Sequence, residues 1–61
     1  MEYYEERINE LEESIKYNVE IRTKIENGNY PAKDAQIRTC NANIEQYEKL
    51  IKQYQQMLSR V

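Results

Sequence analysis

Residues 27–31 read Asn-Gly-Asn-Tyr-Pro, and this cluster of helix-breaking residues decides the fold of the 61-residue chain. Gly28 suits the left-handed position that follows the C-terminus of a helix. Pro31 suits the first turn of a new helix, where its missing N–H costs nothing. We therefore expect one helix to end and a second helix to begin within these few residues.

Two helices of similar length are predicted on the two sides of this cluster, over residues 2–27 and 31–60, with a loop over residues 28–30. Acidic side chains are concentrated in residues 2–13, where they favour the positive end of the first helix dipole. Each helix has about 26 to 30 residues, which gives a length of roughly 40 to 45 Å. The whole chain is thus expected to form a single all-α domain.

Apolar and aromatic residues recur at alternating spacings of three and four along both predicted helices. In the first helix this seam contains Met1, Tyr4, Ile8, Leu11, Ile15, Asn18, Arg22 and Ile25. In the second helix it contains Ile37, Cys40, Ile44, Tyr47, Ile51, Tyr54, Leu58 and Val61. Fourteen of the sixteen positions are apolar or aromatic, which is far above the 39% of the whole chain, so the pattern is a heptad repeat.

The two seams face each other if the chain folds back at the loop and pairs residues whose numbers add to 62. Leu11 then lies opposite Ile51, and Arg22 lies opposite Cys40. Every layer sets a heptad a residue against a d residue, as an antiparallel coiled coil requires. We therefore predict an antiparallel two-helix hairpin. The alternative, one long broken helix in a parallel coiled coil, is disfavoured by the Gly and Pro of the loop.

Apolar residues outside the seam are unevenly placed. Ile21, Leu50 and Met57 all fall at heptad g positions, which line one flank of an antiparallel pair, and the small Ser14 and the longer Arg7 lie between them. The opposite flank, at the e positions, contains Glu5, Glu12, Val19, Asn41, Glu48 and Gln55. One flank is therefore apolar and the other is mostly acidic.

A second copy of the chain is the expected partner of the apolar flank. A domain of this length is marginal as a monomer, and its single Cys cannot form an intramolecular disulfide. We expect Ser14, Ile21, Leu50 and Met57 to pack against the same flank of another copy, which would close a two-fold four-helix bundle. The alternative is that these residues only widen the apolar stripe of an amphipathic helix.

The residue inventory argues against catalysis. Without His, the Ser and Cys nucleophiles that need a neighbouring base cannot be assembled. Glu6, Glu10 and Glu13 share a helix face outside the seam and indicate a solvated surface, not a metal site. A single Gly cannot form a glycine-rich phosphate loop. We expect no enzyme activity, no metal and no cofactor.

Asn18 and Arg22 interrupt the seam and admit two interpretations. As polar residues in a coiled coil they would specify the register and the oligomeric state at some cost in stability. Alternatively, Arg22 joins Arg38 and Thr39 near the loop in a polar pocket for an anionic ligand, because paired guanidinium groups suit phosphate or carboxylate. Cys40, in the same layer as Arg22, is expected to be an inert core thiol.

All six aromatic residues are Tyr, and they fall into two groups. Three belong to the seam, where their rings are expected to pack in the core while their hydroxyl groups reach water. The other three, expected on the outer surface or in the loop, are Tyr3, Tyr17 and Tyr30. Exposed Tyr supplies a large and rigid contact area, so these three residues are the predicted contacts to a partner protein.

Charge and hydropathy limit the location of the protein. The net charge of −2 with interspersed signs gives no broad attraction to nucleic acid or to an anionic membrane. No run of 18 apolar residues occurs, and the acidic N-terminus is unlike a signal peptide, so we expect a cytoplasmic protein. Richness in Ile, Lys, Asn, Glu and Tyr favours an A/T-rich bacterial, phage or mobile-element source. Met1 ahead of a clear helix predicts a complete gene product, although the seam reaching Val61 leaves a continuation open.

Three functions are compatible with these features, besides a purely structural role in oligomerisation. The first, which we favour, is a small regulatory or inhibitory protein that acts by binding a larger protein. The second is an oligomeric hairpin that binds or sequesters an anionic ligand such as a signalling nucleotide; in outline the chain resembles the helical hairpins of phage proteins that sequester immune nucleotides. The third is RNA binding, since in size and shape the chain resembles the hairpin dimers that regulate plasmid copy number, but its lysines are interspersed with glutamates.

Overall fold

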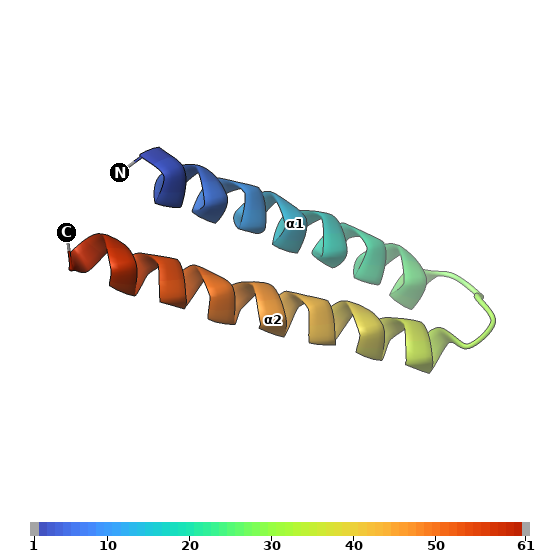
Figure 1. Cartoon of the computed structure of the whole chain (residues 1–61). Coiled ribbons are helices and arrows are strands. Elements are labelled where there is room, and N and C mark those ends of the chain that lie inside the picture. Colours follow the sequence, from blue (N-terminus) through green and yellow to red (C-terminus); the bar gives the residue numbers. More distant parts are fainter. Residues whose placement is uncertain (1, 61) are drawn as a thin grey trace.

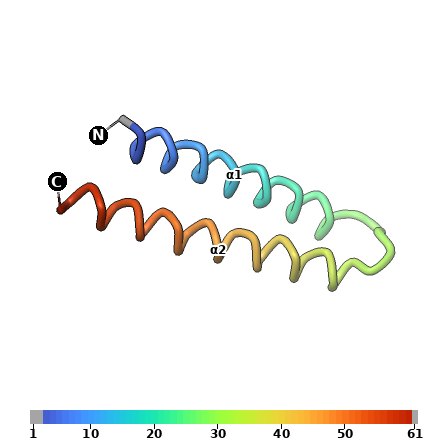
Figure 2. Tube along the Cα trace, in the orientation of Figure 1, coloured from blue at the N-terminus to red at the C-terminus, as the bar shows by residue number. Residues whose placement is uncertain are grey.

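The computed structural model describes residues 2–60 and consists of two α-helices, α1 (Glu2–Asn27) and α2 (Lys33–Ser59). The chain reverses between the helices, so the start of α1 and the end of α2 lie at the same end of a narrow rod (Figure 1). The rod measures 48 × 14 × 11 Å between Cα atoms, and the two helices run side by side along its whole length (Figure 2). The predicted all-α antiparallel hairpin is therefore confirmed.

The seam predicted from the heptad pattern is the contact surface between the helices. Each of its positions from Tyr4 to Leu58 is buried or half-buried, whereas its two ends, Met1 and Val61, lie outside the described residues. Among the described residues the most deeply buried apolar side chains are Leu11, Ile25 and Cys40, which keep 5%, 6% and 6% of their surface exposed. The core is one side chain deep, because a pair of helices has no second layer to cover it.

The two flanks of the seam differ in burial. On the g flank Arg7, Ser14, Ile21, Asn43 and Leu50 are half-buried. On the e flank Val19 is half-buried, whereas the other five e residues named above are exposed. The g flank is thus more buried than the e flank, so part of the apolar flank already widens the core of the single hairpin. Met57, by contrast, remains 43% exposed.

The loop differs from the sequence prediction in three respects. Helix α2 begins at Lys33 and not at Pro31, which lies in a turn ahead of the helix, and it ends at Ser59. Gly28 has no positive φ; the left-handed residue is Ala32, with φ 54° and ψ 38°. Ala32 is the N-cap residue of α2, and its carbonyl accepts the first helical bond of that helix, from the Gln36 N–H at 3.0 Å.

Close packing, and not φ, explains the glycine in the loop. The Gly28 N–H donates to the Ile25 carbonyl at 3.3 Å and closes the last turn of α1. A Cβ atom at Gly28 would collide with the ring of Tyr30 and would lie 3.2 Å from the Lys24 carbonyl oxygen. The Gln36 side-chain amide donates to the Pro31 carbonyl at 2.7 Å and fixes the other side of the loop. The loop is therefore held by local contacts on both sides.

The left-handed conformation of Ala32 predicts that Ala32→Asn stabilises the hairpin. Asn tolerates this region, which costs an ordinary L-residue about 1 kcal/mol or more. We expect the free energy of unfolding, measured by urea denaturation at fixed protein concentration, to rise by about 0.5–1 kcal/mol. The control is Ala42→Asn at an exposed helical position, where Asn is a poorer helix former and should lower the stability by a similar amount. Equal effects at both positions would contradict the left-handed conformation of Ala32.

Within residues 2–60 neither helix combines the length and the apolar content that crossing a membrane requires.

Candidate functional site

The two broad sides of the hairpin carry different side chains. We define the tyrosine face as the side formed by heptad positions c, d and g, and the charged face as the side formed by positions a, b and e. All helical tyrosines fall at c or d positions of the tyrosine face: Tyr3, Tyr4, Tyr17, Tyr47 and Tyr54. Most of the Glu and Lys residues flanking the helix contact lie on the charged face. The hairpin therefore presents an aromatic side and an ionic side.

An aromatic cluster occupies the tyrosine face near the open end of the rod. The ring centroids of Tyr3 and Tyr4 are 5.4 Å apart in an edge-on arrangement, and those of Tyr4 and Tyr54 are 5.7 Å apart. The guanidinium carbon of Arg7 lies 6.0 Å from the centre of the Tyr54 ring, within cation–π range. Such contacts join the two helices where the aliphatic seam ends.

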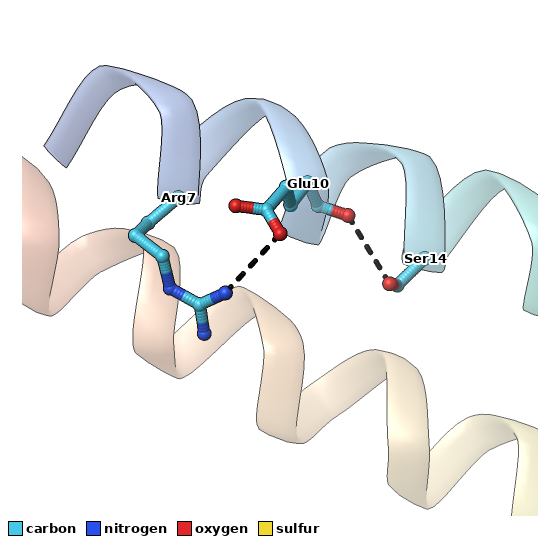
Figure 3. Close-up of polar contacts among 3 residues, drawn as sticks. All are labelled: Arg7, Glu10 and Ser14. Carbon is cyan, nitrogen blue, oxygen red and sulfur yellow. Dashed lines mark hydrogen bonds and ion pairs between the residues drawn. The ribbon is translucent and has the colours of Figure 1, made fainter. Parts of the chain in front are cut away.

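The Arg7 side chain extends from α1 across this cluster and contacts Tyr54 of α2 and Glu10 of α1. Its guanidinium lies 3.4 Å from the Glu10 carboxylate, and the Ser14 hydroxyl donates to the Glu10 carbonyl at 3.1 Å (Figure 3). The phenol of Tyr54, followed by the Glu10 carboxylate, raises the pKa of Arg7 above its ordinary value. Its charge is accordingly paired within α1.

An open groove of about 620 Å³ occupies the tyrosine face on the half of the rod nearer the loop. Its lining is formed by Glu13, Ser14, Tyr17, Asn18, Ile21, Ile25, Gln36, Thr39, Cys40, Asn43 and Tyr47. Amide, hydroxyl and apolar groups dominate this lining, and its carboxylate belongs to Glu13 alone. The groove is thus hollow and nearly uncharged, in contrast to the bulky aromatic cluster at the other end of the same face.

A pair of asparagines forms a polar layer within this groove. Asn18 is 8% exposed; its side-chain N–H donates to the Ser14 carbonyl at 2.8 Å, and its side-chain oxygen accepts from Asn43 at 3.3 Å. Asn43 lies next to Ile44, the residue predicted opposite Asn18, so this bond supports the predicted register to within one position. Buried amides with satisfied bonds fix the pairing of helices at some cost in stability.

A second open groove, of about 530 Å³, lies on the charged face. Its lining consists of Glu12, Ile15, Lys16, Glu48, Ile51, Lys52 and Gln55. The two isoleucines belong to the seam, and each is flanked by a Glu and a Lys four residues apart on the same helix. This groove therefore has an apolar floor and a rim of both charges.

The predicted ligand residues are distributed over different surfaces. Arg22 is half-buried and donates to the side-chain oxygen of Asn41 at 2.7 Å, which turns it toward the charged face. Arg38 is exposed, and the hydroxyl of the exposed Thr39 donates to the Ala35 carbonyl at 3.1 Å. Thr39 lines the groove of the tyrosine face, but neither arginine lines either groove. Both arginines therefore belong to the charged face but lie outside its groove, and a ligand role for these residues stays a prediction.

The predicted partner contacts are indeed on the surface, at 61% exposure for Tyr3, 64% for Tyr17 and 48% for Tyr30. Tyr3 and Tyr17 are 14 residues apart, which is two heptads, so they form one column at the c positions beside the g flank. Tyr17 also lines the groove of the tyrosine face. The predicted partner residues and the predicted oligomer residues thus belong largely to one face, a relation that the heptad register contains but that residue-by-residue reading missed.

Neither a metal centre nor a family assignment defines a site. Within residues 2–60 no three His, Cys, Asp or Glu side chains are grouped closely enough to hold a metal ion. The chain matches no protein-family model, and no similar curated protein or solved structure was found. Its function must therefore be inferred from its two faces.

The polar layer predicts a measurable coupling between Asn18 and Asn43. In a double-mutant cycle with Asn18→Ala and Asn43→Ala, unfolding free energies should depart from additivity by about 0.5–1 kcal/mol, the typical value of one hydrogen bond. Asn41 is the matched control because it is the same residue type two positions away but bonds Arg22. The Asn18–Asn41 cycle should be additive to within about 0.5 kcal/mol. Equal coupling in both cycles would contradict the observed register.

Proposed function

We propose that this chain is a small non-enzymatic regulatory or inhibitory protein of the bacterial or phage-infected cytoplasm that acts as a homo-oligomer on a larger protein. The observation that carries the proposal is its surface. The solvent-accessible surface area of the hairpin is 4873 Å², whereas that of a compact monomer of 7.4 kDa is about 4,200 Å². The excess of about 700 Å² is close to the roughly 800 Å² that each partner buries in a standard protein interface.

The composition of that surface supports protein contacts over chemistry. Four large side chains with apolar surface, Tyr3, Tyr17, Tyr30 and Met57, are between 43% and 64% exposed. Aromatic residues and Met are enriched at protein interfaces, where they supply buried area and, for Tyr, a hydrogen-bonding tip. Both grooves are open and shallow, which suits the packing of another helix better than the enclosure of a small molecule.

The anionic-ligand and RNA-binding alternatives have less support. A phosphate site would need convergent cations, and the arginines that could supply them line neither groove. RNA binding needs a continuous basic face, but Lys16 and Lys52 lie beside Glu12 and Glu48 in the groove of the charged face. A thermal-shift screen with nucleotides and a gel shift at low salt would each reveal these activities as a raised melting temperature or a retarded band.

Oligomerisation is tested by size-exclusion chromatography with light scattering across low-micromolar concentrations. We expect a mass of at least twice 7.4 kDa, together with a melting temperature that rises with protein concentration. A folded monomer with a concentration-independent melting temperature would contradict the oligomeric part of the proposal.

Action on a larger protein is tested by affinity capture from the native host with the charged face altered. Glu12→Lys/Glu48→Lys reverses two rim charges, and Glu6→Lys/Glu20→Lys, which makes the same charge change at exposed positions of the outer surface, is the matched control. We expect a host protein retained by the parent chain to be retained several-fold less by the first variant, with the loss greatest at low salt, because exposed charges mainly steer association. Equal retention by both variants would contradict binding through the charged face.

A further inference from the structure

We infer that a second copy of this chain covers the tyrosine face, with the two loops at opposite ends and the two-fold axis passing next to Ser14. This inference rests on the proposed oligomeric function and specifies its geometry. It moves Tyr3 and Tyr17 from the surface offered to another protein into the contact between copies, and it leaves the charged face and Tyr30 free for the larger partner.

Charge distinguishes which face can meet its own copy. In a two-fold contact the same patch faces itself, so every charge on that patch is taken out of water in both copies at once. The charged face would confront its carboxylates and ammonium groups with those of the second copy around Glu12, Lys16, Glu48 and Lys52. On the tyrosine face the cation of the g flank, Arg7, is already paired with Glu10. Covering this face therefore buries fewer unpaired charges.

Shape determines the relative direction of the two copies. The open-end half of the tyrosine face is bulky, with Tyr3 61% and Met57 43% exposed, whereas the loop half holds the groove of about 620 Å³. If the loops lay at the same end, the bulky half of one copy would meet the bulky half of the other, and the two grooves would face each other. With the loops at opposite ends, each bulky half enters the groove of the other copy, and the fit occurs twice.

The residue register agrees with this arrangement. An axis beside Ser14 places α1 on α1 and α2 on α2 of the second copy, running antiparallel. Counting equal distances on both sides of the axis sets Tyr3 against Ile25 and Arg7 against Ile21 of the second copy. In α2 the same axis sets Met57 against Thr39 of the second copy. Ile21, Ile25 and Thr39 all line the groove.

A small residue is what the centre of such an interface requires. Ser14 is half-buried at a g position, lines the near end of the groove, and lies about midway along α1. Its hydroxyl is already bonded to the Glu10 carbonyl at 3.1 Å, so covering it leaves no unpaired donor. Helices approach most closely where side chains are small, and Ser14 would meet itself there.

Cysteine cross-linking of the full chain in a Cys40→Ala background tests this geometry. Under mild oxidation, Ser14→Cys should form a covalent homodimer, because Cβ atoms on a two-fold axis come within disulfide range. The matched control, Glu12→Cys on the charged face of the same helix, should remain largely uncross-linked. A mixture of Met57→Cys with Thr39→Cys should give a mixed dimer, whereas Met57→Cys with Tyr3→Cys, which loops at the same end would bring together, should not.

The outcomes separate this inference from the proposed function. A dimer by light scattering whose Glu12→Cys variant cross-links while Ser14→Cys does not would overturn the inference and leave the oligomeric function standing. Preferential cross-linking of Met57→Cys with Tyr3→Cys would overturn the loop-opposite geometry. A monomer at all concentrations would overturn both.

A second variant measures the same interface without a disulfide. Met57→Glu places a carboxylate in the proposed contact at an exposed position, so the hairpin itself should keep its helical circular dichroism. We expect the dimer dissociation constant to rise about tenfold or more. Gln55→Glu, an exposed e residue two positions away, adds the same charge on the other side and should change it little. Equal dissociation constants for the two variants would contradict the inference.

Discussion

The contact between α1 and α2 along a single heptad seam is the constraint on which the rest of the structure depends. Within the described residues this seam buries three apolar side chains to 6% exposure or less, Leu11, Ile25 and Cys40, and the polar Asn18 to 8%, while the other seam residues are half-buried. A pair of helices cannot bury its seam residues more fully, because each helix has a single neighbouring helix and the seam is one layer of side chains deep. The open sides of the seam are consequently the sides on which the protein can interact, and their different chemistry is the basis of its proposed function.

The hairpin was predictable from sequence because two independent signals agree. A heptad repeat in each half requires a partner helix, and the breakers between the halves provide the reversal that brings them together. The bond between Asn18 and Asn43 follows from the same register. The loop was not predictable in detail: both Gly28 and Pro31 fit general rules for helix ends, but the ring of Tyr30 occupies the space beside Gly28, and the left-handed turn is made by Ala32. Such local packing depends on atoms that a residue pattern does not represent.

The candidate surfaces were predicted in part. The shared heptad position predicts one flank that contains Ser14, Ile21, Leu50 and Met57. Tyr3 and Tyr17 lie beside that flank because a spacing of 14 residues places both at c positions, a relation that the exposure of each residue alone does not reveal. The separation of Arg22 from Thr39 follows from the same heptad positions, because a residues belong to the charged face and c residues to the tyrosine face, whereas the bond from Arg22 to Asn41 depends on the direction of the side chain. The heptad position therefore predicts the face on which a residue lies, but it does not predict the direction of its side chain or its bonding partner.

The most direct test of the hairpin is a distance between spin labels on the outer surfaces of the two helices near the open end. Glu6→Cys and Gln56→Cys, both exposed, can be labelled in a Cys40→Ala chain and diluted with unlabelled protein so that distances within one molecule dominate. Two adjacent antiparallel helices predict a separation of about 20–30 Å from the helix diameter and interaxial distance. A distance near 75 Å, as a sequence separation of 50 positions along one continuous helix would give, would contradict the antiparallel seam and the two faces that follow from it.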